Sequence, residues 1–273
     1  MSPAGGTRAG RILRSVPAYL VIVFLVAPLV VVAATSFTSG ALVEFPPRGF
    51  SLRWYVTAFG EEQFLEGLAH SAWLAAISTA FALVIGYVAA LAITRNPRGA
   101  RLVNVIALGP LFVSSAVLGL AFLIILSKIG MLGNPFGVLV AYIVITLPFT
   151  TRMIAGVLAG QGTDAEIAAR VYGAGRLRAI MGVTIPLSAQ GVFTAAVYSF
   201  VHAFDESVII NFIGSVRYQT FPGVMIARLR ETFDPVASVY STLILAVTIV
   251  VVVLAARLFG LDRLSGGVGG RDN

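Results

Sequence analysis

The sequence lacks cysteine altogether and has only one lysine and two histidines in 273 residues. Without cysteine the chain can form neither a disulfide nor a thiolate site for catalysis or metal binding. Charged residues are also scarce, at 11%, whereas apolar residues make up 58%. A chain with so little charge is too apolar to be solvated as a water-soluble globule, so the sequence predicts that a lipid bilayer is its solvent.

The single lysine also limits nucleotide chemistry. A Walker phosphate-binding loop needs Gly-Lys followed by Ser or Thr, whereas Lys128 follows Ser127 and precedes Ile129. Any ATP hydrolysis that serves this chain is therefore expected on another subunit, and no cofactor is expected on this one.

Six apolar stretches of the sequence are each long enough to form a membrane-spanning helix. A helix needs roughly 20 residues to cross about 30 Å of hydrocarbon. None of the stretches alternates apolar and polar residues as a membrane-spanning strand does. The sequence therefore predicts an all-α membrane protein with six transmembrane helices. The predicted spans are residues 16–36, 71–94, 102–126, 136–159, 188–213 and 236–259.

The formal net charge of +7 could suggest nucleic-acid binding, but the basic residues sort by side of the predicted spans. If the N-terminus is cytoplasmic, thirteen of the nineteen basic side chains fall on the cytoplasmic side and six on the other. This asymmetry is typical of the positive-inside rule, so it predicts cytoplasmic N- and C-termini and no nucleic-acid partner. The thirteen are Arg8, Arg11, Arg14, Arg95, Arg98, Arg101, Arg152, Arg170, Arg176, Arg178, Arg257, Arg263 and Arg271; the six are Arg48, Arg53, Lys128, Arg217, Arg228 and Arg230.

This topology divides the chain into three parts. Residues 1–15 are expected to form a cytoplasmic N-terminal tail, residues 16–259 the transmembrane domain and residues 260–273 a cytoplasmic C-terminal tail. The arginines before the first span could alternatively belong to a cleaved signal peptide. The first apolar stretch is longer than the roughly 7 to 15 residues usual for a signal peptide, so an uncleaved helix is the simpler interpretation.

The longest predicted cytoplasmic segment, residues 160–187, carries signals for short helices. Its Thr163-Asp-Ala-Glu166 has the pattern of a capping box, in which the hydroxyl and the carboxylate each bind a free amide of the first helical turn. The pattern predicts a helix that starts there and continues to Tyr172. The helix is expected to stop at Gly173 or Gly175, and a positive φ is expected at Gly173, because glycine adopts this conformation without strain.

A second helix is predicted over residues 176–183 of the same segment, and Pro186 is expected to end it. On the first helix, Ile167 and Val171 lie four residues apart and offer an apolar patch. Exposed apolar patches usually mark contact with a partner, so this helix-turn-helix is a candidate docking surface.

This segment resembles the cytoplasmic signature of the inner-membrane permeases of binding-protein-dependent ABC importers. That signature reads Glu-Ala-Ala, three residues, Gly, nine residues, Ile-x-Leu-Pro. Here Ile167-Ala168-Ala169 is followed after three residues by Gly173, and after nine more by Val183-Thr-Ile-Pro186. Ile167 stands where the signature has glutamate, and Glu166 lies one position earlier.

The resemblance implies the type I importer transmembrane domain, in a bacterial inner membrane, with the loop at residues 160–187 forming coupling helices that dock on an ATPase subunit. It implies as partners an ATPase dimer, a second permease subunit that makes a heterodimer, and an extracytoplasmic solute-binding protein. The ATPase-coupling residues that it suggests are Glu166, Ile167, Ala168, Ala169, Gly173, Val183 and Pro186.

The chain is similar over nearly its whole length to the spermidine/putrescine-type permeases. The segments that carry this similarity are residues 50–55, 146–149, 204–208 and 220–222. The similarity implies a polyamine as the substrate. Permeases for ferric iron, thiamine and phosphonates are also similar, so these substrates stay open as alternatives.

The predicted fifth span contains Tyr198, His202, Asp205 and Glu206, whose spacing by three and four places them on one helix face. A charge at the bilayer centre costs roughly 2.5 to 3.5 kcal/mol, so this face is expected to line a cavity or another subunit. One interpretation is a cation-attracting patch on the translocation path, to which Tyr198 adds a cation–π contact. The alternatives are an interhelical ion pair, for example with Arg217, and a metal site, for which three ligands on one turn rarely suffice.

Two other classes of membrane protein fit the sequence less well. A stand-alone secondary transporter needs coupling-ion carboxylates and usually internal repeats, and the sequence shows neither. An intramembrane protease needs a nucleophile with its base, or acids on two spans, whereas the mid-membrane acids here are neighbours on one predicted helix. The chain is therefore expected to be a transport protein and not an enzyme.

Overall fold

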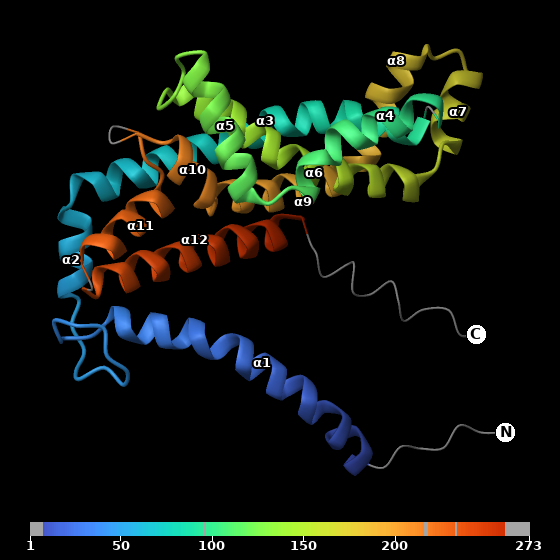
Figure 1. Cartoon of the computed structure of the whole chain (residues 1–273). Helices are drawn as coiled ribbons and strands as arrows, with labels where there is room; N and C mark the ends of the chain where they lie inside the picture. Colours follow the sequence, from blue (N-terminus) through green and yellow to red (C-terminus); the bar gives the residue numbers. More distant parts are fainter. Residues whose placement is uncertain (1–7, 96, 216–217, 233, 260–273) are drawn as a thin grey trace. The chain divides into compact units, whose positions relative to one another are not determined.

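The computed structural model describes residues 8–95, 97–215, 218–232 and 234–259, and these residues are mostly helical (Figure 1). Extended pairing within them is limited to two isolated β-bridges, which confirms the all-α class. Arg217 and the predicted C-terminal tail at residues 260–273 lie outside the described residues, as do residues 1–7. The helices are α1 Arg8–Ser36, α2 Arg53–Gly60, α3 Glu62–Arg95, α4 Pro97–Leu108, α5 Ser115–Lys128, α6 Pro135–Gln161, α7 Asp164–Val171, α8 Arg176–Ala179, α9 Ile185–Phe204, α10 Val208–Ile213, α11 Phe221–Glu231 and α12 Val236–Phe259, with a 3-10 turn η1 at Gly109–Phe112 and a π-helical segment η2 at Ile180–Thr184.

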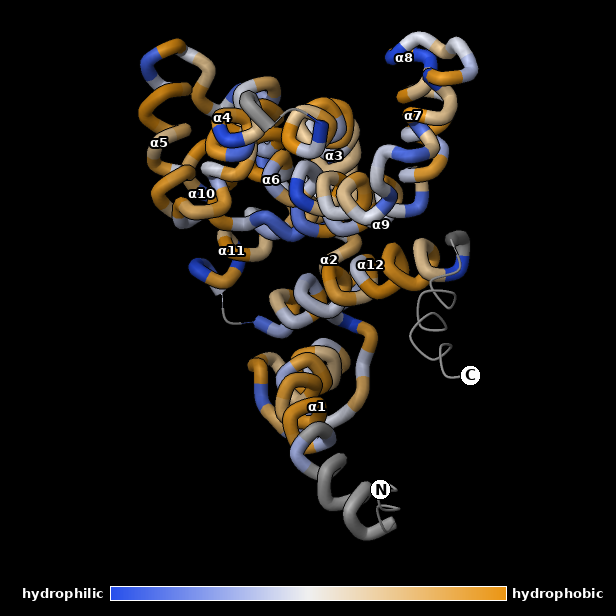
Figure 2. The backbone as a smooth tube through the Cα atoms, turned by 90° about the vertical axis from the view of Figure 1, so that its right-hand side faces the viewer, coloured by the Kyte–Doolittle hydropathy of each residue, from blue (hydrophilic) through white to orange (hydrophobic). Residues whose placement is uncertain are grey.

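Five helices within the described residues are long and apolar enough to cross a membrane, and the bent pair α4 and α5 makes a possible sixth. Figure 2 shows apolar residues along α1, α5 and α12, and the side chains from Tyr19 to Val26 of α1 are all exposed. A helix that is apolar around most of its circumference is suited to lipid rather than to water. The prediction of a multi-span helical membrane protein is therefore confirmed.

The predicted third span is wrong in its course. Residues 102–126 do not form one helix, because the axis bends by 104° between Gly99–Phe112 and Ser115–Lys128. Pro110 has no amide hydrogen to continue the helical ladder and disfavours a helical conformation at the preceding residue, so α4 ends at Leu108. Extended backbone at Val113 and Ser114 then sends the chain in the new direction.

The predicted fifth span is also wrong at its end. Helix α9 stops at Phe204, and the separate short helix α10 begins at Val208. The break falls on the residues proposed for the translocation path, and the contacts that cause it are described below.

The described chain forms two compact units, one of residues 1–62 with 227–246 and one of residues 63–226 with 247–273. In the second unit α6 packs against α9, and α5 packs against α10. Gly191 of α9 permits the first contact, because a Cβ at that position would clash with Val157 of α6. Small residues allow membrane helices to approach closely in the absence of a hydrophobic driving force.

The unit of residues 1–62 and 227–246 is joined by hydrogen bonds between α1, α2 and the start of α12. The Oγ1 atom of Thr35 donates to the Oγ atom of Ser238 at 3.2 Å, and both side chains are buried. The hydroxyls of Ser36 and Tyr55 lie 2.8 Å apart. These contacts fix the start of the connection that follows the first span.

Candidate functional site

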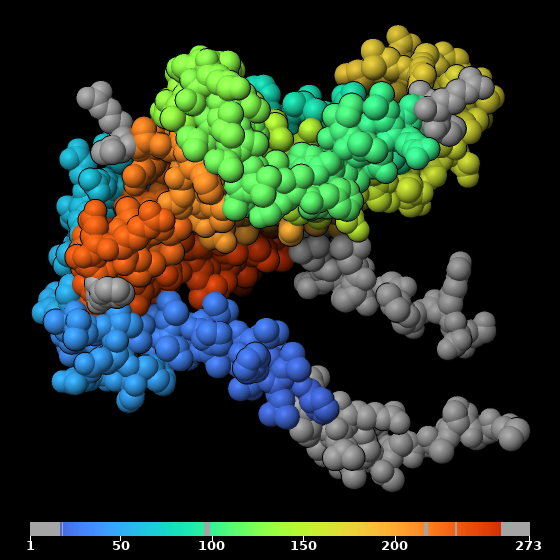
Figure 3. Space-filling model, viewed as in Figure 1, coloured from blue at the N-terminus to red at the C-terminus, as the bar shows by residue number. Residues whose placement is uncertain are grey.

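The connection between α6 and α9 forms the predicted helix-turn-helix, made of α7 and α8. Its turn is a Schellman motif: the amide of Ala174 donates to the carbonyl of Ala169, and the amide of Gly173 donates to the carbonyl of Arg170. Gly173 has a φ of 92°, so the predicted positive φ is confirmed. Figure 3 shows α7 and α8 (yellow) at one end of the unit of residues 63–226 and 247–273.

The predicted capping box is wrong. Thr163 has a ψ of −3° and its side chain makes no hydrogen bond to the first turn of α7. Glu166 is directed to other partners: its Oε2 atom lies 3.2 Å from Nη2 of Arg95 and accepts a hydrogen bond of 3.2 Å from the Oγ1 atom of Thr184. The ion pair with Arg95, whose side chain is 12% exposed, takes the place of the reciprocal cap.

The predicted end of the second helix at Pro186 is wrong as well. Residues 176–204 are helical throughout, and Pro186 lies in the first turn of α9. An interior proline removes one amide donor and its ring clashes with the carbonyl four residues earlier. The π-helical segment directly before α9 has a wider turn, which accommodates the ring and lets the helix continue.

The side chains of the loop divide into an inner and an outer set. Glu166 is buried, with 8% of its surface exposed, whereas Ile167 is 51%, Val171 80% and Tyr172 92% exposed. The exposed side of the loop therefore carries an apolar patch, although Asp164 and Arg170 of α7 are exposed as well. Of the other residues expected in coupling, Ala168 and Pro186 are exposed, and Ala169 and Val183 are half-buried.

The four residues proposed for the translocation path do not share one helix face. Tyr198 and His202 lie on α9 with their rings stacked at a centroid distance of 6.4 Å, but Asp205 follows the end of the helix and Glu206 lies in the break. The cause is the carboxylate of Glu206, whose Oε1 atom accepts hydrogen bonds from the amides of Val208 at 2.8 Å and Ile209 at 3.0 Å. This side chain caps the start of α10 and so stabilises a new helix.

The structure nevertheless brings the four residues together around one cavity. Tyr198, His202, Asp205 and Glu206 line a space of about 350 Å³. Asp205 is exposed there. Glu206 is buried, and its carboxylate accepts hydrogen bonds from the two amides of α10. The negative charge that a solute could meet in this cavity is therefore that of Asp205. Within the described residues no cluster of three His, Asp or Glu side chains is arranged to hold a metal ion.

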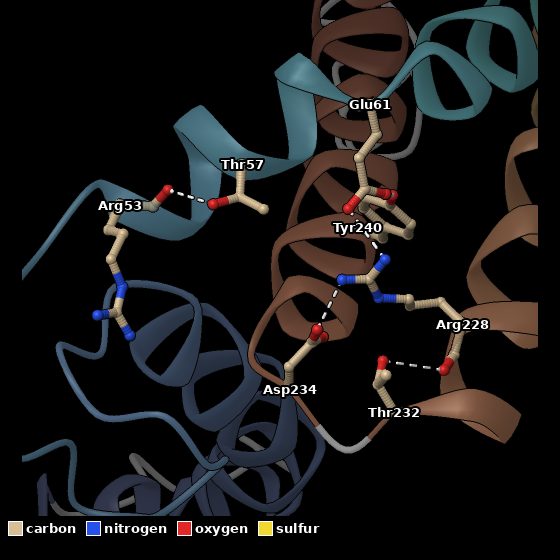
Figure 4. A network of polar contacts seen from close by, with 7 residues as sticks. All are labelled: Arg53, Thr57, Glu61, Arg228, Thr232, Asp234 and Tyr240. Carbon is tan, nitrogen blue, oxygen red and sulfur yellow. Dashed lines mark hydrogen bonds and ion pairs between the residues drawn. The ribbon is translucent and has the colours of Figure 1, made fainter.

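An ion-pair network near the end of α2 was not predicted from the sequence (Figure 4). Nη1 of Arg228 donates to Oε1 of Glu61 at 2.9 Å, and Nη2 donates to Oδ2 of Asp234 at 2.7 Å. The hydroxyl of Tyr240 donates to Oε2 of Glu61 at 2.9 Å. The hydrogen bond to Asp234 raises the pKa of Arg228 above its ordinary value, so the cation is retained. Arg228 and Glu61 are 167 positions apart, so no sequence spacing could have paired them.

The helical membrane fold and the helix-turn-helix between two spans define the class of protein to which this chain belongs. Residues 82–264 match the family described as the binding-protein-dependent transport system inner membrane component. The chain belongs to this family and is thus a permease subunit of an ABC importer, a multi-pass protein of the bacterial inner membrane.

Individual relatives agree on the class and differ in their solutes. The chain is 25% identical over 265 residues to the spermidine/putrescine transport system permease protein PotC of Escherichia coli K12, covering 95% of this chain and 98% of that protein. It is 28% identical over 260 residues to the sulfoquinovosyl glycerol transport system permease protein SmoH of Agrobacterium fabrum, covering 92% and 91%. In fold it is similar to a chain of a bacterial alginate ABC transporter, with a TM-score of 0.73 at 16% identity over 91% of this chain and 94% of the other.

Proposed function

We propose that this permease forms half of the translocation pathway of its importer and docks on a separate ATPase through the loop at residues 160–187. The observation that carries the proposal is an exposed apolar patch on and directly after α7: Ile167 and Val171 of this eight-residue helix are exposed, as is Tyr172, which follows it. Such a surface is costly in water and suited to a groove on a protein partner. The loop is cytoplasmic in this proposal, because thirteen basic side chains lie on its side of the predicted spans.

The other partners follow from the same proposal. A second permease subunit completes the pathway as a heterodimer, and an extracytoplasmic solute-binding protein delivers the solute. A structure of the alginate transporter in complex with its solute-bound periplasmic protein, similar to this chain with a TM-score of 0.72, supports the latter partner. The chain transports and does not itself hydrolyse ATP, because its one lysine is not in a Walker loop.

The docking surface can be tested by placing a charge on it. The variant Val171→Asp is expected to lose the ATPase on co-purification, because a carboxylate would be buried in an apolar interface. The matched control is Ile129→Asp, an exposed apolar residue after α5 that the charge asymmetry places on the opposite side of the membrane. Retention of the ATPase by Val171→Asp, or its loss in both variants, contradicts the proposed surface.

The substrate that the observations favour is a polyamine or a related small cationic solute. Asp205 supplies a negative charge to the cavity, and the ring of Tyr198 can add a cation–π contact. The relatives named for spermidine and putrescine transport support this choice, whereas the sulfoquinovosyl glycerol relative keeps other solutes in competition.

Uptake by the reconstituted importer decides among these solutes. Proteoliposomes with internal ATP are expected to accumulate labelled spermidine or putrescine, with excess unlabelled polyamine as competitor. Accumulation of ferric iron, thiamine, a phosphonate or an anionic glycoside in its place would show that the polyamine assignment is wrong while the permease class stands.

A further inference from the structure

Three elements of the unit of residues 63–226 and 247–273 meet at the carboxylate of Glu166. Arg95 is the last residue of α3, Glu166 lies in α7, and Thr184 is the last residue of the π-helical segment that leads into α9. The ion pair and the hydrogen bond to Glu166 are both 3.2 Å long. We refer to these three side chains as the Glu166 junction.

The junction also holds the start of the loop. Nη1 of Arg95 donates to the carbonyl of Gly162 at 3.1 Å, two residues before α7 begins. One guanidinium therefore binds the backbone that precedes α7 and the carboxylate inside it. This arrangement fixes the helix at two points relative to the end of α3.

Helix α7 needs such support because it is only eight residues long and has no side-chain cap. An isolated helix shorter than about 12 residues is marginal in water, so its position depends on tertiary contacts. The side chains of Arg95 and Glu166 are only 12% and 9% exposed. Separating the two charges in this largely buried site leaves each without an opposite charge, so the contact resists opening when the helix is pushed.

We propose that Glu166 is a positioning residue that makes α7 move as one body with the ends of α3 and α9. A displacement imposed on the exposed face of α7 then reaches two membrane helices at once. This inference rests on the proposed docking of the loop on an ATPase. It also gives a role to the departure from the permease signature. Ile167, which stands where the signature has glutamate, is exposed, and Glu166, one position earlier, is buried.

The first test measures transport and hydrolysis separately in the complete importer in proteoliposomes. Glu166→Ala is expected to retain the ATPase and its hydrolysis while solute uptake per ATP falls at least ten-fold. Thr184→Val removes only one hydrogen bond and is expected to lower the same ratio about two- to three-fold. The control is Glu66→Ala, which removes an exposed acid near the other end of α3, away from the loop, and is expected to change nothing.

Two outcomes of this test overturn the inference. One is an unchanged ratio of uptake to hydrolysis in Glu166→Ala. The other is loss of the ATPase from both Glu166→Ala and Thr184→Val, since the junction would then only shape the docking surface. If the ATPase instead stays bound to Val171→Asp, the proposed docking fails, which is a different result from a failed junction.

The second test measures a distance that a merely structural role would not control. The chain has no cysteine of its own, so spin labels can be attached at Val88→Cys of α3 and Ala165→Cys of α7 with cysteine-free partner subunits. The label distance is expected to be the same in nucleotide-free and ATP-trapped importer. When Thr184→Val or Glu166→Gln is combined with the two labels, the distribution of label distances is expected to broaden and to differ between the nucleotide-free and ATP-trapped importer. A distance that changes with nucleotide in the unmodified junction, or that stays fixed in both junction variants, overturns the inference.

Discussion

Two adjacent acids in the break after α9 have different surroundings. Asp205 is exposed in the cavity beside Tyr198 and His202, whereas Glu206 is buried and accepts two backbone amides of α10. The carboxylate of Glu206, which accepts two backbone hydrogen bonds, therefore stabilises the local fold. Function and structure at this position can therefore be separated by substituting one acid at a time.

The variant Asp205→Asn is expected to weaken uptake without affecting assembly. Loss of one partly solvated charge removes about 1 kcal/mol of attraction for a cation. That energy corresponds to a roughly five-fold higher solute concentration for half-maximal uptake. The measurement is the concentration dependence of uptake in proteoliposomes, with subunit co-purification as the control. Normal uptake by Asp205→Asn excludes this carboxylate from the path.

The variant Glu206→Ala is expected to act on stability instead. It leaves the amides of Val208 and Ile209 without an acceptor, at a cost of about 1 to 3 kcal/mol. Thermal unfolding in detergent is expected to occur at a lower temperature, and Glu206→Gln, which keeps an acceptor oxygen, is expected to recover most of the loss. Equal stability of Glu206→Ala and the unmodified chain would show that the cap is dispensable.

Gly173 is expected to tolerate no β-branched side chain because of its backbone conformation. There is open space around it, so a side chain would meet no neighbour, but its φ of 92° strains any L residue. The left-handed conformation costs roughly 1 to 2 kcal/mol for a residue with a Cβ, and the Schellman turn would be lost. Gly173→Val is therefore expected to reduce both ATPase co-purification and uptake.

The matched control for this variant is Gly175→Val. Gly175 also has open space around it, but its φ is −64°, which valine adopts readily. If Gly173→Val and Gly175→Val retain the ATPase equally and support equal uptake, the positive φ at Gly173 is not required and the loop is an ordinary connection.

Between elements, the network of Arg228 with Glu61 and Asp234 connects segments that are distant in sequence (Figure 4). Arg228 belongs to α11, Asp234 precedes α12, and Glu61 joins α2 to α3. The hydroxyl of Tyr240 adds a contact from α12 to the same glutamate. A single guanidinium thus holds the ends of several helices of the unit of residues 1–62 and 227–246 together.

Arg228→Met is expected to destabilise this unit by about 1 to 2 kcal/mol, since two carboxylates lose their cation in a partly exposed site. The measurement is the thermal unfolding of the detergent-solubilised chain, and Arg230→Met on the same helix is the exposed control. In a double-mutant cycle, Glu61→Gln with Arg228→Met is expected to cost less than the sum of the single changes. Additive effects would show that the two side chains do not stabilise each other.

At the scale of the whole molecule, the charge asymmetry predicts which side of the membrane each connection occupies. Arg101 in α4 is expected on the cytoplasmic side and Lys128 at the end of α5 on the opposite side. Because the chain has no cysteine, Arg101→Cys and Lys128→Cys can be labelled one at a time in intact cells. A membrane-impermeant thiol reagent is expected to label only Lys128→Cys. Labelling of Arg101→Cys without permeabilisation refutes the topology.

The bent third span bears on this topology. A chain that turns by 104° between α4 and α5 can reach the opposite side only as a broken span, whereas the length of the apolar stretch predicted one continuous helix. Gly109 and Pro110 were the available signal for the break. The same labelling pair therefore tests whether the bent segment crosses the membrane.

The sequence by itself determined the membrane environment, the helical class, the family resemblance and the positive φ of Gly173. These properties depend only on residues that are close together in the sequence. About 20 apolar side chains in a row suffice for a span, and one glycine suffices for a left-handed turn. Only the tertiary structure decided where Glu166 and Arg228 find their partners, and where the third and fifth spans break. The best partner of a buried charge lies wherever folding brings an opposite charge, here 167 positions away for Arg228 and Glu61, so local spacing cannot reveal it.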